Sequence, residues 1–415
     1  MVPRLDILFV GFDEFGVFNM AEPRSGYVQL IFSSMASLGL KGHRPAYLQI
    51  TKAPTESRSS ISVKEDIIRL NMKGQMIRFA NFRVTVSKNT TLMRTRGLWK
   101  NVLPQVLKSV DLTPELVVGE GNASHYFTRP LCQTLGIPNV LRLHSIRGWY
   151  APIIAKCSGE FTEVFKAPLS ILHTVVLAHL SDHVITITEV ERKALQKFMV
   201  KSVSTIEPTY VRKTQITEPK LLNKISFDID KITARPFVLY VGRVTARKTP
   251  SAMALKLLLK VASLTPEVQF LVVGSNTDQI RAILGVSLNG LKNVLALGYI
   301  NDYALEALYK KASIVLLPLP FLTGVSLRLI EALAYGKVII TTTIVASKLR
   351  NLRNGKHIIV EDNIKLYRDW IHNLINREEC RKSLEDNAKQ YFKTELSPAI
   401  HASRFEQLLF NIKGL

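Results

Sequence analysis

Two cations lie close together in the second half of the chain. The segment VGRVTARKTP places Arg243 and Lys248 five residues apart, after an apolar run and before Pro250, which suits the first turn of a helix. Two cations on such a loop, at the carboxyl end of a strand, could hold a diphosphate from two sides. The motif is short, so this segment alone leaves an ordinary charged surface loop open as the alternative.

A second candidate anion site lies downstream, in FLTGVSLRLIEALAYGKVIITT (residues 321–342). A helix is predicted to begin at residues 324–327, where unpaired backbone N–H groups and the positive end of the helix dipole favour a phosphate. Glu331 lies further along this helix and could accept hydrogen bonds from the vicinal hydroxyls of a ribose. The alternative is a Glu at the edge of the core, paired with Arg328 or Lys337. The predicted phosphate contacts are Gly324, Val325, Ser326 and Leu327.

Short apolar runs that alternate with helical patterns would position these residues. The first half of the chain contains DILFVGF, PAYLQI, ELVVGE, NVLRLHS and HVITIT, and a second series follows with FVLYVGR, VQFLVVGS, NVLALGYI, SIVLLPLP, KVIITTT and HIIVED. Helical segments such as PSAMALKLLLKVASL and DYALEALYKKA separate the runs. This rhythm predicts an α/β protein with two doubly wound, Rossmann-like domains that face each other across a cleft, where strand carboxyl ends carry the ligand sites.

The length and one polar segment define the expected domains. A chain of 415 residues exceeds what one core usually supports. Residues 211–236 are polar, with proline near each end, as expected of an interdomain connection. We therefore expect an amino-terminal acceptor-binding domain over residues 1–212 and a carboxy-terminal donor-binding domain over residues 213–393. A helix over residues 394–415 could pack back on the amino-terminal domain.

The chain is strongly basic, and its charge is unevenly distributed. The net charge is +22, and residues 67–110 contain nine basic side chains and no acidic one. Such a field attracts phosphates or an anionic membrane surface, whereas a solvated face of a basic protein is the plain alternative. The charge comes without a recognised nucleic-acid-binding motif or a basic–aromatic platform, which disfavours nucleic acid as the partner.

Cysteine usage and hydropathy bear on the compartment. Cys132, Cys157 and Cys380 are widely spaced, as expected of reduced structural thiols in a cytoplasmic protein. The apolar run near the amino terminus reads better as a strand than as a signal peptide. The longest apolar segment, APLSILHTVVLAHLSDHVITI, is interrupted by three histidines and an aspartate, so it is not a spanning helix. We expect a cytoplasmic protein, peripheral at the inner membrane face if residues 67–110 bind lipid.

The two phosphate motifs together resemble the nucleotide-binding half of GT-B glycosyltransferases, in particular the large retaining family 4. There the motifs read V-G-R-x4-K-G and E-G-x-G-x6-E-A-x-A-x-G-x-P-V, and this chain has VGRVTARK and GVSLRLIEALAYGKVIITT. The resemblance covers about residues 236–393 and extends more weakly over the first half. It implies that Arg243 and Lys248, after Gly242, neutralise the donor diphosphate, and that Glu331 holds the ribose hydroxyls.

The same resemblance assigns further positions. The loop after NVLALG, with Tyr299 and Ile300, corresponds to the loop that contacts the base. Gly26 begins the helix predicted in SGYVQLIFSSMASLGLKGH, where backbone could approach a donor phosphate. His144, at the end of NVLRLHS, would orient the transferred sugar, although a lone His after a strand is often structural.

The chain also departs from the family pattern. Thr323 stands where the family has its first Glu, which commonly touches the transferred sugar, so donor identity stays open. Thr249 replaces a glycine and Val338 replaces a proline. The acceptor half lacks the usual N-G-V-D sequence. Asp228 and the aspartate two residues later mimic a D-x-D metal motif, but their place in the linker indicates turn chemistry.

The resulting hypothesis is hexosyl transfer from a nucleoside diphosphate sugar to a glycan or lipid-linked acceptor, with retention of the anomeric configuration. The resemblance implies that the departing phosphate takes the acceptor proton, so neither a metal nor another cofactor is expected. One alternative is a GT-B-like nucleotide-sugar epimerase. Another is a non-catalytic protein that binds nucleotide sugars or nucleic acid.

Overall fold

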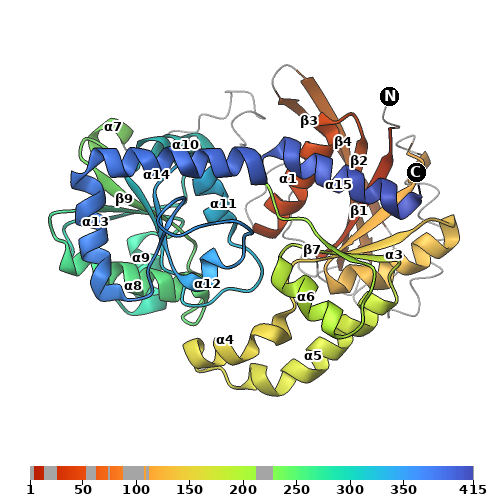
Figure 1. Ribbon diagram of the computed structural model, residues 1–415, viewed down its shortest axis with the longest axis horizontal. Helices are drawn as coiled ribbons and strands as arrows, with labels where there is room; N and C mark the ends of the chain where they lie inside the picture. Colours follow the sequence, from red (N-terminus) through yellow and green to blue (C-terminus); the bar gives the residue numbers. More distant parts are fainter. Residues whose placement is uncertain are drawn as a thin grey trace. The chain divides into compact units, whose positions relative to one another are not determined.

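The computed structural model describes residues 4–13, 26–52, 62–72, 75–86, 107–108, 112–211 and 228–414. By its contacts the chain divides into two compact units (Figure 1). Unit 1 comprises Met1–Trp149, Lys166–Val211 and Pro398–Leu415, and unit 2 comprises Tyr150–Phe165 and Arg212–Ser397. The segment Tyr150–Phe165, which the sequence placed with the amino-terminal domain, groups with unit 2 instead.

Unit 1 is built on an eight-stranded sheet with the order β3-β4-β2-β1-β5-β6-β7-β8. Within this sheet all neighbours pair in parallel except the antiparallel β3 and β4. The strands β5 and β6 are buried along their whole length, as expected of a parallel sheet covered on both faces. The strands are β1 (Asp6–Asp13), β2 (Arg44–Lys52), β3 (Ser62–Met72), β4 (Gln75–Val86), β5 (Leu116–Glu120), β6 (Asn139–Leu143), β7 (His183–Thr186) and β8 (Val203–Thr205).

Helices cover this sheet. α1 packs on β2 and β4, and α3 packs on β1, β5 and β6. Figure 1 shows α15 alongside α1, although the two are far apart in the sequence. The aromatic ring of Phe405 on α15 lies 6.0 Å from that of Phe9 on β1, so the last helix contributes to the core of unit 1. The helices are α1 (Gly26–Leu40), α3 (Asn122–Leu135), α5 (Thr162–His179, across the division of the units), α6 (Glu189–Lys197) and α15 (Pro398–Lys413).

Unit 2 contains a six-stranded sheet with the order β11-β10-β9-β12-β13-β14, and all its strands pair in parallel. The chain runs from β9 outward to β10 and β11, and then returns to β12 on the other side of β9. The strands are β9 (Phe237–Val241), β10 (Gln269–Val273), β11 (Val294–Gly298), β12 (Ile314–Leu317), β13 (Ile339–Thr341) and β14 (Ile359–Val360).

The helices of unit 2 follow local sequence signals. α8 coincides with the predicted PSAMALKLLLKVASL, because Thr249 caps it by accepting from the Ala252 N–H at 3.2 Å and Pro250 occupies its first position. Within the described part of the chain, no helix combines the length and apolar character needed to cross a bilayer. The helices are α4 (Ala151–Ser158), α7 (Ile229–Ile232), α8 (Pro250–Leu264), α9 (Thr277–Leu284), α10 (Asp302–Lys311), α11 (Leu327–Ala334), α12 (Thr343–Ala346), α13 (Tyr367–Asn376) and α14 (Glu378–Tyr391).

The predicted α/β class with two doubly wound sheets is confirmed. The sequence analysis did not predict the β3–β4 hairpin, because its basic residues were interpreted only as a charged surface. A Lys–Gly pair at residues 73–74 separates the two β-branched runs and was the available turn signal.

Candidate functional site

The predicted donor residues of unit 2 gather at the carboxyl edge of its sheet. β9 and β12 are neighbours, and the strand order reverses between them. Open α/β sheets bind ligands outside the strand carboxyl ends at such a switch point. The loop from β9 to α8 carries Arg243 and Lys248, and the segment after β12 leads into α11. Both candidate phosphate elements therefore flank the same point of the sheet.

The loop after β9 is held by close backbone contacts. The Gly242 N–H donates to the Val273 carbonyl at 2.8 Å, and Ser275 Oγ accepts from the Val244 N–H at 2.9 Å. Gly274 has φ +98°, and a Cβ there would lie 2.9 Å from the Gly242 carbonyl carbon. Only glycine permits this approach. The loop is thus fixed against the end of β10. The residues responsible, Gly274 and Ser275, lie in the VVGS segment, and the sequence analysis assigned them no role.

The loop between β9 and α8 carries three cations, and one of them forms a hydrogen bond to the protein backbone. Arg243 and Lys248 are both exposed. Arg247, between them, is also exposed but donates from Nε to the Ile283 carbonyl at 2.8 Å, which ties its guanidinium to α9. The two predicted phosphate ligands thus share their loop with a third cation that has a structural partner.

The start of α11 has an incomplete cap. Ser326 is the N-cap residue, and its side chain caps no backbone N–H group. Its Oγ is buried, with the residue 3% exposed, and has no hydrogen-bond partner among the described residues. Burying a hydroxyl group without a hydrogen-bond partner costs free energy. A ligand oxygen bound at this position would supply the missing partner. Gly324 has φ +70°, which requires glycine before the helix. The nearby Thr323, Val325 and Leu327 are half-buried.

Arg328, which the sequence analysis considered only as a partner for Glu331, joins the two phosphate elements. Its Nη1 donates to the Val241 carbonyl at 3.0 Å, and its Nη2 donates to Ser251 Oγ at 3.1 Å. A Cβ at Gly242 would lie 2.7 Å from Nη1 and 2.6 Å from the hydroxyl oxygen of the buried Tyr240, so any larger residue here would displace one of these groups. This side chain therefore fixes the first turn of α11 against the end of β9 and the start of α8.

Glu331 has a partner on α10 that the sequence analysis did not consider. Tyr309 on α10 donates from its hydroxyl to Glu331 Oε2 at 3.2 Å. Burial, and then the Glu331 charge, raise the pKa of Tyr309 well above its usual value, so the phenol remains a donor. Lys337 pairs with Glu385 at 3.4 Å instead. Glu331 is half-buried, and the tyrosine orients its carboxylate.

The predicted base-contacting loop follows β11. The Gly274 N–H donates to the Gly298 carbonyl at 2.7 Å, so this loop is linked to the one after β10. Gly298 has φ +68°. Tyr299 is 67% exposed, and Ile300 is half-buried. The aromatic ring is thus presented to solvent at the same edge of the sheet.

In unit 1, His144 follows β6 and contacts an acid that the sequence analysis had not assigned. His144 Nε2 lies 2.6 Å from Glu120 Oε2, and Arg142 lies 2.6 Å from Glu120 Oε1. Burial alone would raise the pKa of Glu120, but the charge of Arg142 and the hydrogen bonds of His144 and Arg142 together lower it. Glu120 is therefore a buried carboxylate that orients the imidazole. The signal was an acid at the end of β5, the strand beside β6.

Other predicted features are less informative. Gly26 is the first residue of α1 in unit 1, whereas the remaining donor residues belong to unit 2. The side chains of residues 67–106 lie outside the described residues. Asp228 caps α7 by accepting from the Asp230 N–H at 3.0 Å, as its turn interpretation predicted. Where the structure describes side chains, no three potential metal ligands cluster.

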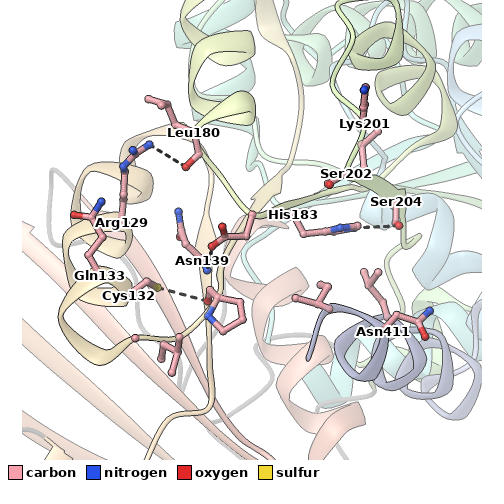
Figure 2. A pocket seen from close by; sticks show the side chains of 17 residues that line it. Arg129, Cys132, Gln133, Asn139, Leu180, His183, Lys201, Ser202, Ser204 and Asn411 are labelled. Atoms are coloured by element: carbon pink, nitrogen blue, oxygen red, sulfur yellow. Dashed lines mark hydrogen bonds between the residues drawn. The ribbon is translucent and has the colours of Figure 1, made fainter. Parts of the chain in front are cut away.

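A cavity of about 950 Å³ lies where the parallel strands of unit 1 begin, at the edge of the sheet opposite to the one that carries His144 (Figure 2). Asn139 and His183, the first residues of β6 and β7, line it, and His183 Nε2 lies 3.1 Å from Ser204 Oγ. His144 follows the other end of β6. This cavity includes none of the predicted site residues.

Residues 223–391 match the family model described as glycosyl transferases group 1. No curated protein matches the sequence. Sucrose-phosphate synthase from Thermosynechococcus elongatus has a similar structure, with 15% identity, a TM-score of 0.67, and coverage of 98% of this chain and 99% of that one. Anabaena Alr3699/HepE in complex with UDP has 14% identity, a TM-score of 0.66, and coverage of 98% and 100%. The catalytic domain of starch synthase IV from Arabidopsis thaliana, bound to ADP and acarbose, has 12% identity, a TM-score of 0.63, and coverage of 100% of both chains. This likeness identifies the fold as the predicted GT-B fold.

Proposed function

We propose that this protein is a glycosyltransferase that moves a sugar from a nucleoside diphosphate sugar to an acceptor, with retention of the anomeric configuration. One observation carries the proposal. The loop with Arg243 and Lys248 and the uncapped start of α11 flank the switch point of one sheet, and Arg328 fixes one element against the other. A diphosphate is the ligand whose charge and size suit these groups.

The chemistry requires stabilisation of the departing diphosphate and of an oxocarbenium-like sugar. Positive charge that is fixed before the reaction stabilises the leaving group without reorganisation. Arg243, Lys248 and the first amides of α11 supply it, so we propose that no metal is needed. The departing phosphate would take the acceptor proton, as the resemblance implies.

The remaining residues would bind the rest of the donor. Glu331, oriented by Tyr309, would accept hydrogen bonds from the ribose hydroxyls, and the exposed ring of Tyr299 would contact the base. His144, held by Glu120, would orient the transferred sugar. Thr323 replaces the family's acid, so several donor sugars belong in the test below. The proposed acceptor is a glycan or a lipid-linked saccharide, and the proposed location is the cytoplasm.

The comparisons support this proposal in two ways. The matched family segment, residues 223–391, contains every donor residue assigned in unit 2. Two proteins with a similar fold have been solved with UDP or ADP, as their descriptions state. We infer that this chain binds a ligand of the same nucleoside diphosphate class.

The test is a thermal-unfolding screen against UDP- and ADP-linked sugars, followed by incubation of the best ligand with oligosaccharide acceptors. A ligand that binds the folded state raises the melting temperature. We expect a clear rise with at least one nucleotide sugar and a glycosylated product whose anomeric configuration matches the donor. A melting temperature that no nucleotide or nucleotide sugar changes would contradict the proposal.

Thr323 favours a second candidate, a protein that binds nucleotide sugars without transferring them. It would show the same thermal shift but no product. A nucleotide-sugar epimerase would change the donor with no acceptor present, so the incubation without acceptor separates all three.

A further inference from the structure

The outward face of α5 is apolar. Phe161, directly before this helix, and Leu180, directly after it, are exposed, and five large apolar residues between them are exposed as well. One of the five, Val164, is 38% exposed and lies to the side of the others. The remaining six side chains and their exposed fractions are Phe161 65%, Phe165 82%, Leu169 73%, Leu172 59%, Val176 45% and Leu180 45%. We call these six residues the α5 stripe.

The spacing of the α5 stripe is helical. Successive members are separated by four, four, three, four and four residues. At 3.6 residues per turn, all six lie within an arc of about 100° and extend over roughly 28 Å. The buried residues of the same helix, Thr174, Leu177 and Ala178, lie on the opposite side. A surface helix of a soluble protein carries polar residues on its outward face, so this helix has the pattern of one that is covered on both sides.

Two further apolar side chains project beside the end of α5. His179 Nε2 donates to the Phe198 carbonyl at 3.0 Å, which places the end of α6 next to α5 (Figure 1). Phe198 is 40% exposed and Met199 is 76% exposed. Met199 has φ +59°, a conformation that is strained for such a residue, yet it presents its side chain to solvent. The exposed apolar surface therefore continues from α5 onto the loop after α6.

The charges around this surface are mainly positive. Lys166 on α5, Lys193 and Lys197 on α6, and Lys201 are exposed. Of the acidic residues nearby, Glu160 and Glu163 lie at the amino-terminal end of the α5 stripe, whereas the lysines of α6 lie near its other end. Glu189 pairs with Arg192, and the Asp182 carboxylate accepts from the Asn139 N–H at 2.8 Å. The chain as a whole carries +22. An apolar stripe flanked by lysines matches the boundary between acyl chains and anionic headgroups.

We propose that α5 lies in the interface of an anionic membrane, with the α5 stripe among the acyl chains and the flanking lysines at the headgroups. The helix lies in the membrane plane and does not cross it. The proposal is independent of the proposed function, because it involves none of the donor residues. It also differs from the sequence-based prediction for residues 67–110, which concerned charge alone.

The test is flotation of the full chain with vesicles of phosphatidylcholine, or of phosphatidylcholine mixed with phosphatidylglycerol. The wild type should float with the mixed vesicles. Leu169→Gln combined with Leu172→Gln keeps helix propensity and should weaken binding at least ~10-fold. The matched control is Leu264→Gln with Leu366→Gln, which removes two leucines of 43% and 42% exposure in unit 2 and should float like the wild type.

A charge series separates the lysines from the stripe. Lys193→Gln with Lys197→Gln should weaken binding to mixed vesicles by roughly 10-fold, whereas Lys260→Gln on α8 should have a much smaller effect. Thermal unfolding should show that all variants remain folded, and the leucine variants should bind nucleotide sugars like the wild type.

Three outcomes would overturn the proposal. One is a wild type that floats with neither vesicle. Another is a Leu169/Leu172 variant that floats as well as the wild type, which would assign membrane binding to another surface. The third is a dimer in light scattering that the same variant converts to a monomer while vesicle binding is absent, because a second copy of the chain would then cover the stripe.

Discussion

Arg328 on α11 donates a hydrogen bond of 3.0 Å to the backbone carbonyl of Val241, the last residue of β9. This contact joins residues 87 positions apart in the sequence, at the point where the strand order of the sheet reverses. Its second hydrogen bond, to Ser251, reaches the first turn of α8. One guanidinium thus sets the spacing of the two elements assigned to the diphosphate.

Arg328→Met should therefore lower both stability and donor affinity. It removes the hydrogen bonds to the Val241 carbonyl and to Ser251 Oγ, which costs about 1–3 kcal/mol. Urea unfolding measures that loss, and calorimetry at a temperature where the variant is folded measures binding of the nucleotide sugar. We expect Arg328→Lys, with its single point charge, to restore only part of the affinity. Unchanged affinity in the methionine variant would show that the contact serves the fold alone.

Arg243→Ala combined with Lys248→Ala should lower kcat/KM for transfer by more than tenfold, or about 1.4 kcal/mol, because the diphosphate loses both cations. The matched control is Arg247→Ala, which removes a cation from the same loop whose guanidinium is bound to the Ile283 carbonyl. The control should retain most of its activity. Equal losses in the two variants would indicate a general effect of loop charge.

Ser326→Ala should change stability and binding in different directions. Its buried hydroxyl has no partner among the described residues, so removal should leave the melting temperature of the free protein unchanged or raise it. Affinity for the nucleoside diphosphate should fall by roughly tenfold, because a hydrogen bond to phosphate is lost. Thr249→Ala is the contrasting case. That residue caps α8, so its loss should destabilise the fold by about 1 kcal/mol.

Glu331→Ala should remove discrimination between ribose and deoxyribose. The wild type should bind the 2′-deoxy nucleoside diphosphate about tenfold more weakly, because a carboxylate placed for a hydroxyl is then left unpaired. The variant should bind both forms equally. Tyr309→Phe, which removes only the phenol that orients Glu331, should have a smaller effect. Wild-type protein that binds both forms equally would contradict the assignment.

Stability should fall as the pH falls from about 6.5 to about 4. Burial, the largest cause in each case, lowers the pKa of His125, His183 and His401 from 6.5 to about 4. Between these values the unfolded chain binds more protons than the folded one, so the unfolding free energy rises with pH and is fully present above about 6.5. Urea titrations at pH 7 and pH 5 measure the slope. His183→Asn should reduce it.

Local signals account for what could be predicted. Thr249 and Pro250 marked the start of α8, and the apolar run that follows set its length. Gly242, Arg243 and Lys248 could be predicted as site residues because they lie within seven positions of one another on a single loop. The fold class followed from the repeated alternation of strand and helix patterns.

The contacts that fix the site were beyond sequence reasoning. The pairing of Glu120 with His144 depends on β5 lying beside β6 in a particular register. Arg328 reaches Val241 because β12, which precedes α11 in the chain, returns to pair with β9. Ser326 was predicted as a phosphate contact from its place at the start of a helix, and only its surroundings reveal that the hydroxyl is unpaired.

The return of α15 to unit 1 has a consequence for biosynthesis. Residues 398–413 supply Phe405 and His401 to a core whose strands are made first, and most of unit 2, residues Arg212–Ser397, is translated in between. While the ribosome is still producing unit 2, the nascent amino-terminal portion would expose the apolar groove that this helix later fills. Chaperones would have to bind this surface during that interval. A stop codon just before Pro398 would destabilise unit 1, which contains the first residues of the chain, more than unit 2.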